Sequence, residues 1–129
     1  MKINEIAFVC YPVTNLKIAK LFYEDLLGLK ATNTWVKDDT NGFIEYDLGS
    51  STLAIGAGAP TFSPGKSGPC VSLEVADFDS AVKQLKENKI KFLMEPSENP
   101  MCHMILIEDP DGNQLMIHKR KPKQDKNAN

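Results

Sequence analysis

The sequence has few cysteines, and their arrangement excludes several classes of small protein. Cys10, Cys70 and Cys102 are odd in number, and no two of them are spaced as CxxC. A disulfide framework needs paired cysteines, and a zinc ribbon needs closely spaced ones. The sequence therefore predicts three free thiols rather than a disulfide-linked or zinc-stabilised scaffold.

Long apolar runs and a strong net charge are also missing. No apolar stretch approaches the roughly 20 residues that a membrane-spanning helix requires. The net charge of −2 produces no field that would attract nucleic acid. The first residues, MKINEIAFVCYPV, lack the cationic stretch, long apolar run and cleavage site of a secretion signal. We expect a cytoplasmic protein whose partners are small molecules or a second copy of the chain.

What the sequence does contain is typical of one compact domain. Its 129 residues are 42% hydrophobic and 25% charged, which allows a sizeable core. After a first β-prone run, apolar residues recur at three- and four-residue steps, with Thr14 or Asn15 as the cap and Gly28 at the end, and this predicts an amphipathic helix. Three more β-prone runs follow. The expected elements are a strand over 3–9, a helix over 15–27 and strands over 30–36, 43–48 and 52–56.

The second half of the sequence repeats this order. Residues 59–69 hold three prolines and two glycines, which is typical of a connector. Beyond them, Asp77 can cap a second helix. The other expected elements are strands over 71–75, 90–94, 101–107 and 114–118. Val13 matches Val75 at an offset of 62, and neighbouring residues match at the same offset, so the order βαβββ occurs twice.

Three motifs give the chain a resemblance to a known family. PVTNLKIAKLFYEDLLGLK, LEVADFDSAVKQLKENKI and EDPDGNQLMIH, spread over most of residues 3–118, resemble segments of the vicinal oxygen chelate superfamily of glyoxalases, bleomycin-resistance proteins and extradiol dioxygenases. The resemblance implies an α+β fold in which two βαβββ modules form a curved mixed-sheet cup. Module one would span about 3–57, a linker 58–69 and module two about 70–118, within one domain. The polar stretch 119–129 is expected to be a disordered tail.

The resemblance also implies where a metal would bind. Metal-dependent members carry four ligands, usually His, Glu or Gln, on the first and fourth strands of the two modules. These positions fall on Glu5, Ala54, Cys70 and Met116. Alanine has no donor atom, and a thioether is a poor ligand for hard divalent ions. The usual metal site is therefore expected to be absent, although the same four residues, together with His118, could still line a ligand cup.

Other residues offer a substitute chemistry. His118 lies two residues after Met116, so both should project from one face of a strand. Glu5, Cys70 and His118 could then form a three-ligand site for a divalent metal. His103 is a further candidate for ligand contact or acid–base catalysis. Cys102, its neighbour, should point to the other face and pack in the core.

Two functions remain open from the sequence alone. The first is a protein that binds a small organic molecule in a β-cup without turnover. The second is a lyase, isomerase or dioxygenase-type enzyme that uses a noncanonical metal, or Glu5 with His103 or His118 as base and acid. A symmetric homodimer is expected, because one helix per module is too little to cover four strands, although a monomer is possible at this length.

The metal assignment generates a first prediction. Protein purified without a metal-binding tag should contain no stoichiometric nickel, iron or manganese, because Ala54 and Met116 replace two of the oxygen or nitrogen donors that such ions prefer. Elemental analysis after dialysis measures this directly. Near-equimolar amounts of any of the three metals would contradict the assignment.

Overall fold

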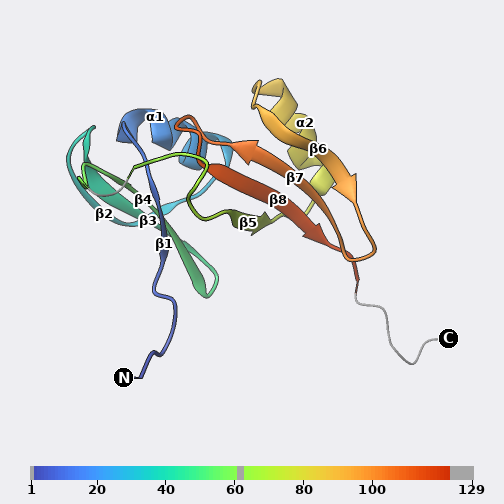
Figure 1. Ribbon diagram of the computed structural model, residues 1–129, viewed down its shortest axis with the longest axis horizontal. Helices are drawn as coiled ribbons and strands as arrows, with labels where there is room; N and C mark the ends of the chain where they lie inside the picture. Colours follow the sequence, from blue (N-terminus) through green and yellow to red (C-terminus); the bar gives the residue numbers. More distant parts are fainter. Residues whose placement is uncertain (1, 61–62, 123–129) are drawn as a thin grey trace. The chain divides into compact units, whose positions relative to one another are not determined.

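The computed structural model describes residues 2–60 and 63–122, and it contains two modules of the same topology (Figure 1). The expected α+β fold with two βαβββ modules is confirmed. The first module consists of β1 (Val9–Pro12), α1 (Leu16–Lys20), a π-helix η1 (Leu21–Leu26), β2 (Ala31–Asp38), β3 (Asn41–Leu48) and β4 (Ser51–Ala57). The second consists of β5 (Val71–Glu74), α2 (Phe78–Glu87), β6 (Phe92–Glu98), β7 (Cys102–Glu108) and β8 (Gln114–Arg120).

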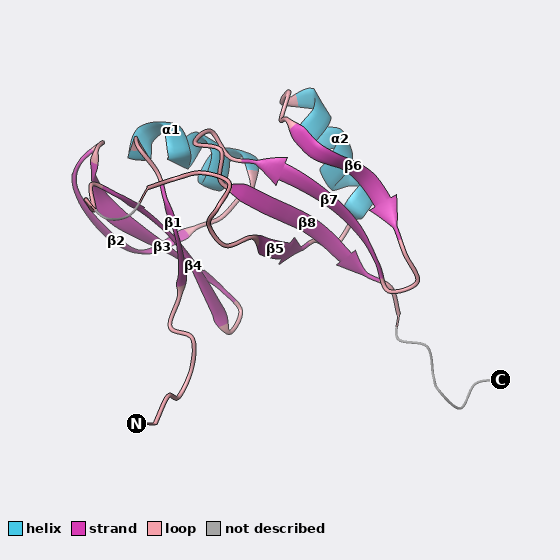
Figure 2. Ribbon diagram, in the orientation of Figure 1, coloured by secondary structure: helices cyan, strands magenta, loops and turns pink. Residues whose placement is uncertain are grey.

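Each module forms a mixed four-stranded sheet (Figure 2). The strand orders are β1-β4-β3-β2 and β5-β8-β7-β6, so the first strand of each module lies at an edge. It pairs in parallel with the last strand, and the remaining neighbours are antiparallel. The chain divides into two compact units, of which the first also contains the turn Asp109–Asn113. No helix in the described ranges is long and apolar enough to span a membrane.

The helices begin where the sequence predicts. Asn15 caps α1 by accepting a hydrogen bond from the backbone N–H of Ile18, and Asp77 caps α2 in the same way with Ser80. In the first unit, one sheet face is covered by α1 and η1. In the second, α2 buries Phe78 and Leu85. The side chains buried with these helices include Tyr23, Tyr46, Ile44 and Ile55 in the first unit and Ile105, Ile107, Leu115 and Ile117 in the second.

Three sequence boundaries are corrected. The first strand begins at Val9 rather than residue 3; in the register that pairs Val9 with Leu53, residues before Ala7 would lie beyond Ser51, where β4 begins. The single helix expected over 15–27 changes to π geometry from residue 21, where the Leu27 N–H bonds the Phe22 carbonyl at 2.9 Å. The last strand continues through Arg120 into the predicted tail. The prediction for 123–129 lies outside the described residues.

A buried polar cluster occupies the turn between β7 and β8. Asp109 is 5% exposed and accepts four hydrogen bonds, from the backbone N–H groups of Asp111 and Asn113 and from the Tyr23 hydroxyl and the Asn113 amide, at 2.8–2.9 Å. The Asn113 amide also donates to the Pro12 carbonyl at 2.7 Å. Burial raises the pKa of Asp109, and the hydrogen bonds from Asn113 and Tyr23 oppose that rise. The turn motif therefore has a structural role within the first unit.

This cluster generates a stability prediction. Asp109→Asn replaces one carboxylate oxygen with an amide NH₂ group, which then faces hydrogen-bond donors. At least one buried donor is left without an acceptor, and the free energy of unfolding should fall by about 2–3 kcal/mol. Urea unfolding followed by circular dichroism measures the change. Asp111→Asn is the matched control, because its amide oxygen can still accept the 2.6 Å bond from Thr14. Equal stability of the two variants would show that the Asp109 network contributes little.

Candidate ligand-binding site

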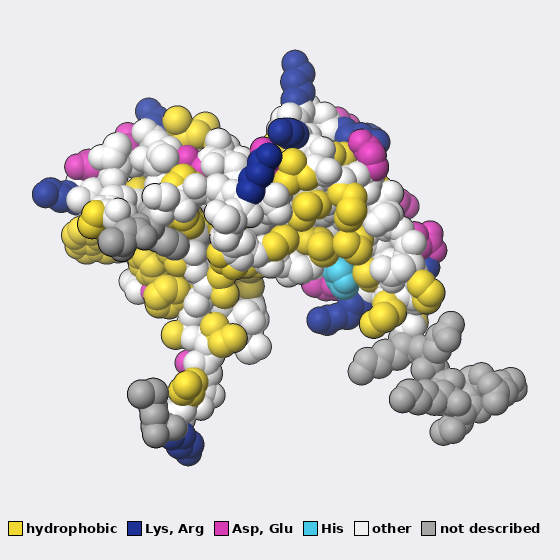
Figure 3. Space-filling view, viewed as in Figure 1, with side chains coloured by type: hydrophobic (Ala, Val, Ile, Leu, Met, Phe, Trp, Pro, Cys, Tyr) yellow, Lys and Arg dark blue, Asp and Glu magenta, His cyan; other side chains and the backbone are white. Residues whose placement is uncertain are grey.

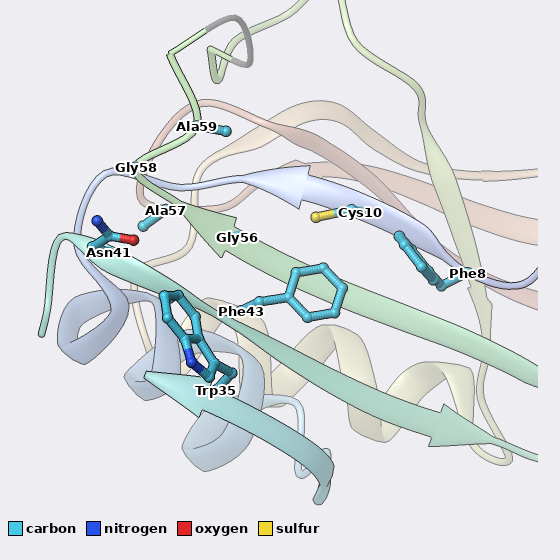
Figure 4. Close-up of a pocket in the computed structure, with 10 residues that line it drawn as sticks. Phe8, Cys10, Trp35, Asn41, Phe43, Gly56, Ala57, Gly58 and Ala59 are labelled. Carbon is cyan, nitrogen blue, oxygen red and sulfur yellow. The ribbon is translucent and has the colours of Figure 1, made fainter. Parts of the chain in front are cut away.

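A pocket of about 430 Å³ opens on the sheet of the first unit (Figure 4). Tyr11, Ile44 and Ile55 are buried in the unit's core, and their strand neighbours project from the opposite sheet face. Residues of all four strands line the pocket on that opposite face. The lining residues are Phe8, Cys10, Trp35, Asn41, Gly42, Phe43, Gly56, Ala57, Gly58 and Ala59. The pocket is therefore built on the open side of the sheet.

Strand register explains why the aromatic side chains meet. Gly56 is opposite Phe43, and Phe43 is opposite Trp35, so the three form one row across β4, β3 and β2. The rings of Phe8 and Phe43 pack edge to face, with centroids 5.3 Å apart. Trp35 is 62% exposed and Phe8 44%. An apolar cluster of this kind left open to solvent is typical of a binding surface.

Two glycines shape the pocket. A Cβ at Gly42 would lie 2.8 Å from both Leu16 Cδ1 and the Trp35 carbonyl oxygen, so glycine is needed for β2 and β3 to pack on the helix. A Cβ at Gly56 would lie 3.3 Å from Cys10 Sγ and 3.5 Å from Phe43, on the pocket side. The absence of a side chain at Gly56 thus leaves the pocket floor open.

The chemistry of the pocket is predominantly apolar. Among the lining residues, Asn41 supplies a side-chain amide and Cys10 a thiol. Burial raises the pKa of Cys10 to about 11, so the thiol stays protonated at neutral pH. The pocket is suited to contact with an apolar ring system, and none of its described lining residues carries an ionised side chain.

The residues expected as metal ligands lie in different surroundings. Glu5 is exposed in the stretch before β1, and Ala54 is fully buried beside Cys10 on β4. Cys70 is exposed just before β5, and Met116 is half-buried on β8. Among the residues that the structure describes, no three His, Cys, Asp or Glu side chains form a group that could hold a metal ion.

The strand register of the two sheets indicates which residue of the first unit corresponds to Cys70. Cys10 is opposite Ala54 in the first sheet, and Ser72 is opposite Met116 in the second. Cys70 lies two residues before Ser72, and the residue two before Cys10 is Phe8. Phe8 rather than Glu5 therefore corresponds to Cys70. A phenyl ring, a methyl group, a thiol and a thioether do not fit the donor set of a hard divalent metal.

The two histidines have separate environments in the second unit. His118 Nδ1 lies 2.6 Å from Glu74 Oε1, and Glu74 Oε2 accepts the backbone N–H of Arg120 at 2.7 Å. These bonds hold the pKa of Glu74 below its usual range. His103 packs beside the ring of Phe78 on the helix side, with ring centroids 5.5 Å apart.

Cys102 is buried, as predicted. The catalytic roles of Glu5, His103 and His118 stay predictions.

The sequence predicted a ligand cup but did not identify the aromatic residues that line this pocket. The described lining residues include none of those expected in the cup, which are Glu5, Ala54, Cys70, Met116 and His118. The available signal was the repeat offset of 62, which relates Cys70 to Phe8 and Met116 to Ala54. Applied to every position, that offset would have pointed to Phe8.

Comparison with known proteins identifies the family. The model of the Glyoxalase/Bleomycin resistance protein/Dioxygenase superfamily matches residues 2–117. The chain belongs to this superfamily. The comparison with curated proteins finds no match.

Several solved structures share the fold of this superfamily member. TnmS3, an antibiotic binding protein from Streptomyces sp. CB03234, is 21% identical, with a TM-score of 0.76 over 94% of this chain and 99% of that one. A superfamily member from Sphaerobacter thermophilus is 24% identical, with a TM-score of 0.70 over 91% and 98%. A glyoxylase/bleomycin resistance protein/dioxygenase domain from Frankia sp. EAN1pec is 20% identical, with a TM-score of 0.70 over 95% and 96%. At these identities the likeness concerns the fold.

The environment of Cys10 generates a reactivity prediction. Because the thiolate is the nucleophile and the pKa is about 11, alkylation of Cys10 by iodoacetamide should be slow at pH 7 and should accelerate about tenfold per pH unit up to pH 10. Mass spectrometry of the peptide that contains Cys10 measures the rate. The exposed Cys70 should react faster at pH 7. Equal rates for the two thiols at pH 7 would contradict the burial argument.

Proposed function

We propose that the protein binds a small planar aromatic molecule in the pocket of the first unit and holds it without chemical change. The observation that carries this proposal is the row formed by Gly56, Phe43 and Trp35. Phe43 and Trp35 offer π-faces or edges for stacking, and Gly56 leaves room for a ring to approach the backbone. The volume of about 430 Å³ falls within the usual range for small-molecule sites.

The absence of reactive groups from the lining supports binding rather than turnover. Of the pocket's side chains, the Asn41 amide can orient a polar substituent, and the Cys10 thiol is held protonated by burial. General acid–base catalysis requires a group whose pKa lies near the working pH. The description of TnmS3 as an antibiotic binding protein agrees with a binding role on this fold. The ligand of this chain is therefore inferred to be an aromatic metabolite or drug-like molecule.

The pocket generates a binding prediction. Trp35→Ala should weaken binding of planar probes such as acridine or anthracene derivatives about tenfold or more, because stacking and burial of one aromatic ring contribute about 1–2 kcal/mol. Gly56→Val should weaken binding to a similar extent by filling the floor. Isothermal calorimetry measures both, and quenching of Trp35, the single tryptophan, reports contact in the wild type.

Val36→Ala is the matched control, because Val36 adjoins Trp35 on β2 and does not line the pocket. It should bind the probes as the wild type does. Chromatography of the recovered probe should show an unchanged compound. Equal affinity of Trp35→Ala and Val36→Ala would place the ligand elsewhere, and conversion of the probe would contradict binding without turnover.

A further inference from the structure

The second unit leaves one face of its sheet open, and methionines gather there. Leu115 and Ile117 alternate along β8 with Met116 and His118, and the first two are buried while the second two are half-buried. Figure 3 shows hydrophobic side chains gathered beside a histidine on this unit. The strand pairing places these residues on the open face: Ser72, Glu74, Met94, Met104, Leu106, Met116 and His118.

The register arranges part of this face in a row. His118 on β8 is opposite Glu74 on β5 and opposite Met104 on β7. Directly opposed residues in a sheet have Cβ atoms about 5 Å apart, and their side chains lie on the same face. Met116 lies two residues before His118, so its side chain stands about 7 Å along the same strand and on the same face. Met104, Met116 and His118 therefore surround one point above the sheet.

Glu74 prepares the imidazole of His118 for binding. The 2.6 Å bond from His118 Nδ1 to Glu74 Oε1 places the ring proton on Nδ1, which leaves the lone pair on Nε2. The bond from the Arg120 N–H to the second Glu74 oxygen fixes the carboxylate. In metal sites, a carboxylate behind a histidine in this way fixes the orientation of the ring.

We propose that Met104, Met116 and His118 form a site for a soft monovalent cation, Cu(I), with Glu74 as the residue that positions His118. Two thioethers and one imidazole nitrogen are ligands that a soft cation accepts and that hard divalent ions do not prefer. The unbranched methionine side chains can move to close a three-coordinate shell. The negative charge of Glu74 lies behind the histidine and compensates the charge of the bound cation.

Ag(I) is a suitable probe, because it is a soft monovalent cation that does not undergo redox chemistry with the protein. The three thiols would compete for it, and Cys70 precedes β5 on the same face. The titration therefore uses the full chain as the variant Cys10→Ala, Cys70→Ser, Cys102→Ala, labelled with ¹³C at the methionine methyl groups. One equivalent of Ag(I) should shift the methyl resonances of Met104 and Met116, and that of Met101, which is 79% exposed and outside the strands, should stay in place.

Variants define the ligand set. Met104→Leu and Met116→Leu conserve volume and should each weaken Ag(I) binding at least tenfold, while Met101→Leu leaves it unchanged. Glu74→Gln should weaken binding about tenfold yet preserve the two methyl shifts, because it removes only the orientation of His118. This split distinguishes a positioning residue from a ligand.

The same titration on the wild-type protein guards against misfolding of the cysteine-free variant. There the thiols take the first equivalents, and further Ag(I) must move the methyl groups of Met104 and Met116. The proposal is overturned if the Met101 resonance shifts as much as the other two, or if Met104→Leu and Met116→Leu bind Ag(I) as tightly as their parent. Equal affinity for Zn(II) would also overturn it, since a site made of thioethers should reject a divalent ion that prefers thiolate or carboxylate.

Discussion

The buried carboxylate of Asp109 is the interaction on which the arrangement of the first unit depends. Four donors converge on it: three from its own turn, namely two backbone N–H groups and the Asn113 amide, and one from the π-helix, the Tyr23 hydroxyl. Because an uncompensated buried charge costs several kcal/mol, these partners must stay in place for the unit to fold. The turn therefore fixes both the helix segment that carries Tyr23 and, through Asn113, the end of β1 at Pro12.

This constraint reaches the pocket through β1 and the π-helix. The bond to the Pro12 carbonyl anchors the strand that carries Cys10, and Phe8 directly precedes that strand. Two adjacent residues of the π-helix make hydrogen bonds to other elements. The Tyr23 hydroxyl donates to Asp109, and Glu24 accepts from the Tyr46 hydroxyl on β3. In a regular α-helix, the side chains of adjacent residues point about 100° apart. The wider π geometry over Leu21–Leu26 agrees with the need for Tyr23 and Glu24 to reach both of their partners. The network thus positions two of the strands that line the site.

The sequence alone predicts the fold but does not identify the residues of the candidate site. Periodicity, the caps at Asn15 and Asp77 and the repeat predicted the order of the elements, because these signals are local, but not the start of β1 or the π-helix η1. The pocket depends on the register in which neighbouring strands pair, which composition does not encode. Trp35, Phe43 and Gly56 become neighbours only through register, and Glu74 meets His118 in the same way. The resemblance assigns Glu5 to the first strand, whereas β1 begins only at Val9.

The two proposed functions use equivalent rows of residues in the two units. In the first unit the row runs Pro12, Gly56, Phe43 and Trp35, and in the second Glu74, His118, Met104 and Ser97. The backbone is equivalent in both, so the side chains alone decide what the open face can bind. In the functions proposed above, the glycine and aromatic rings of the first unit hold a flat apolar ligand, and the histidine, carboxylate and thioether of the second hold a soft cation. Exchange of residues along this row, rather than any change of fold, would therefore be enough to move one function to the other unit.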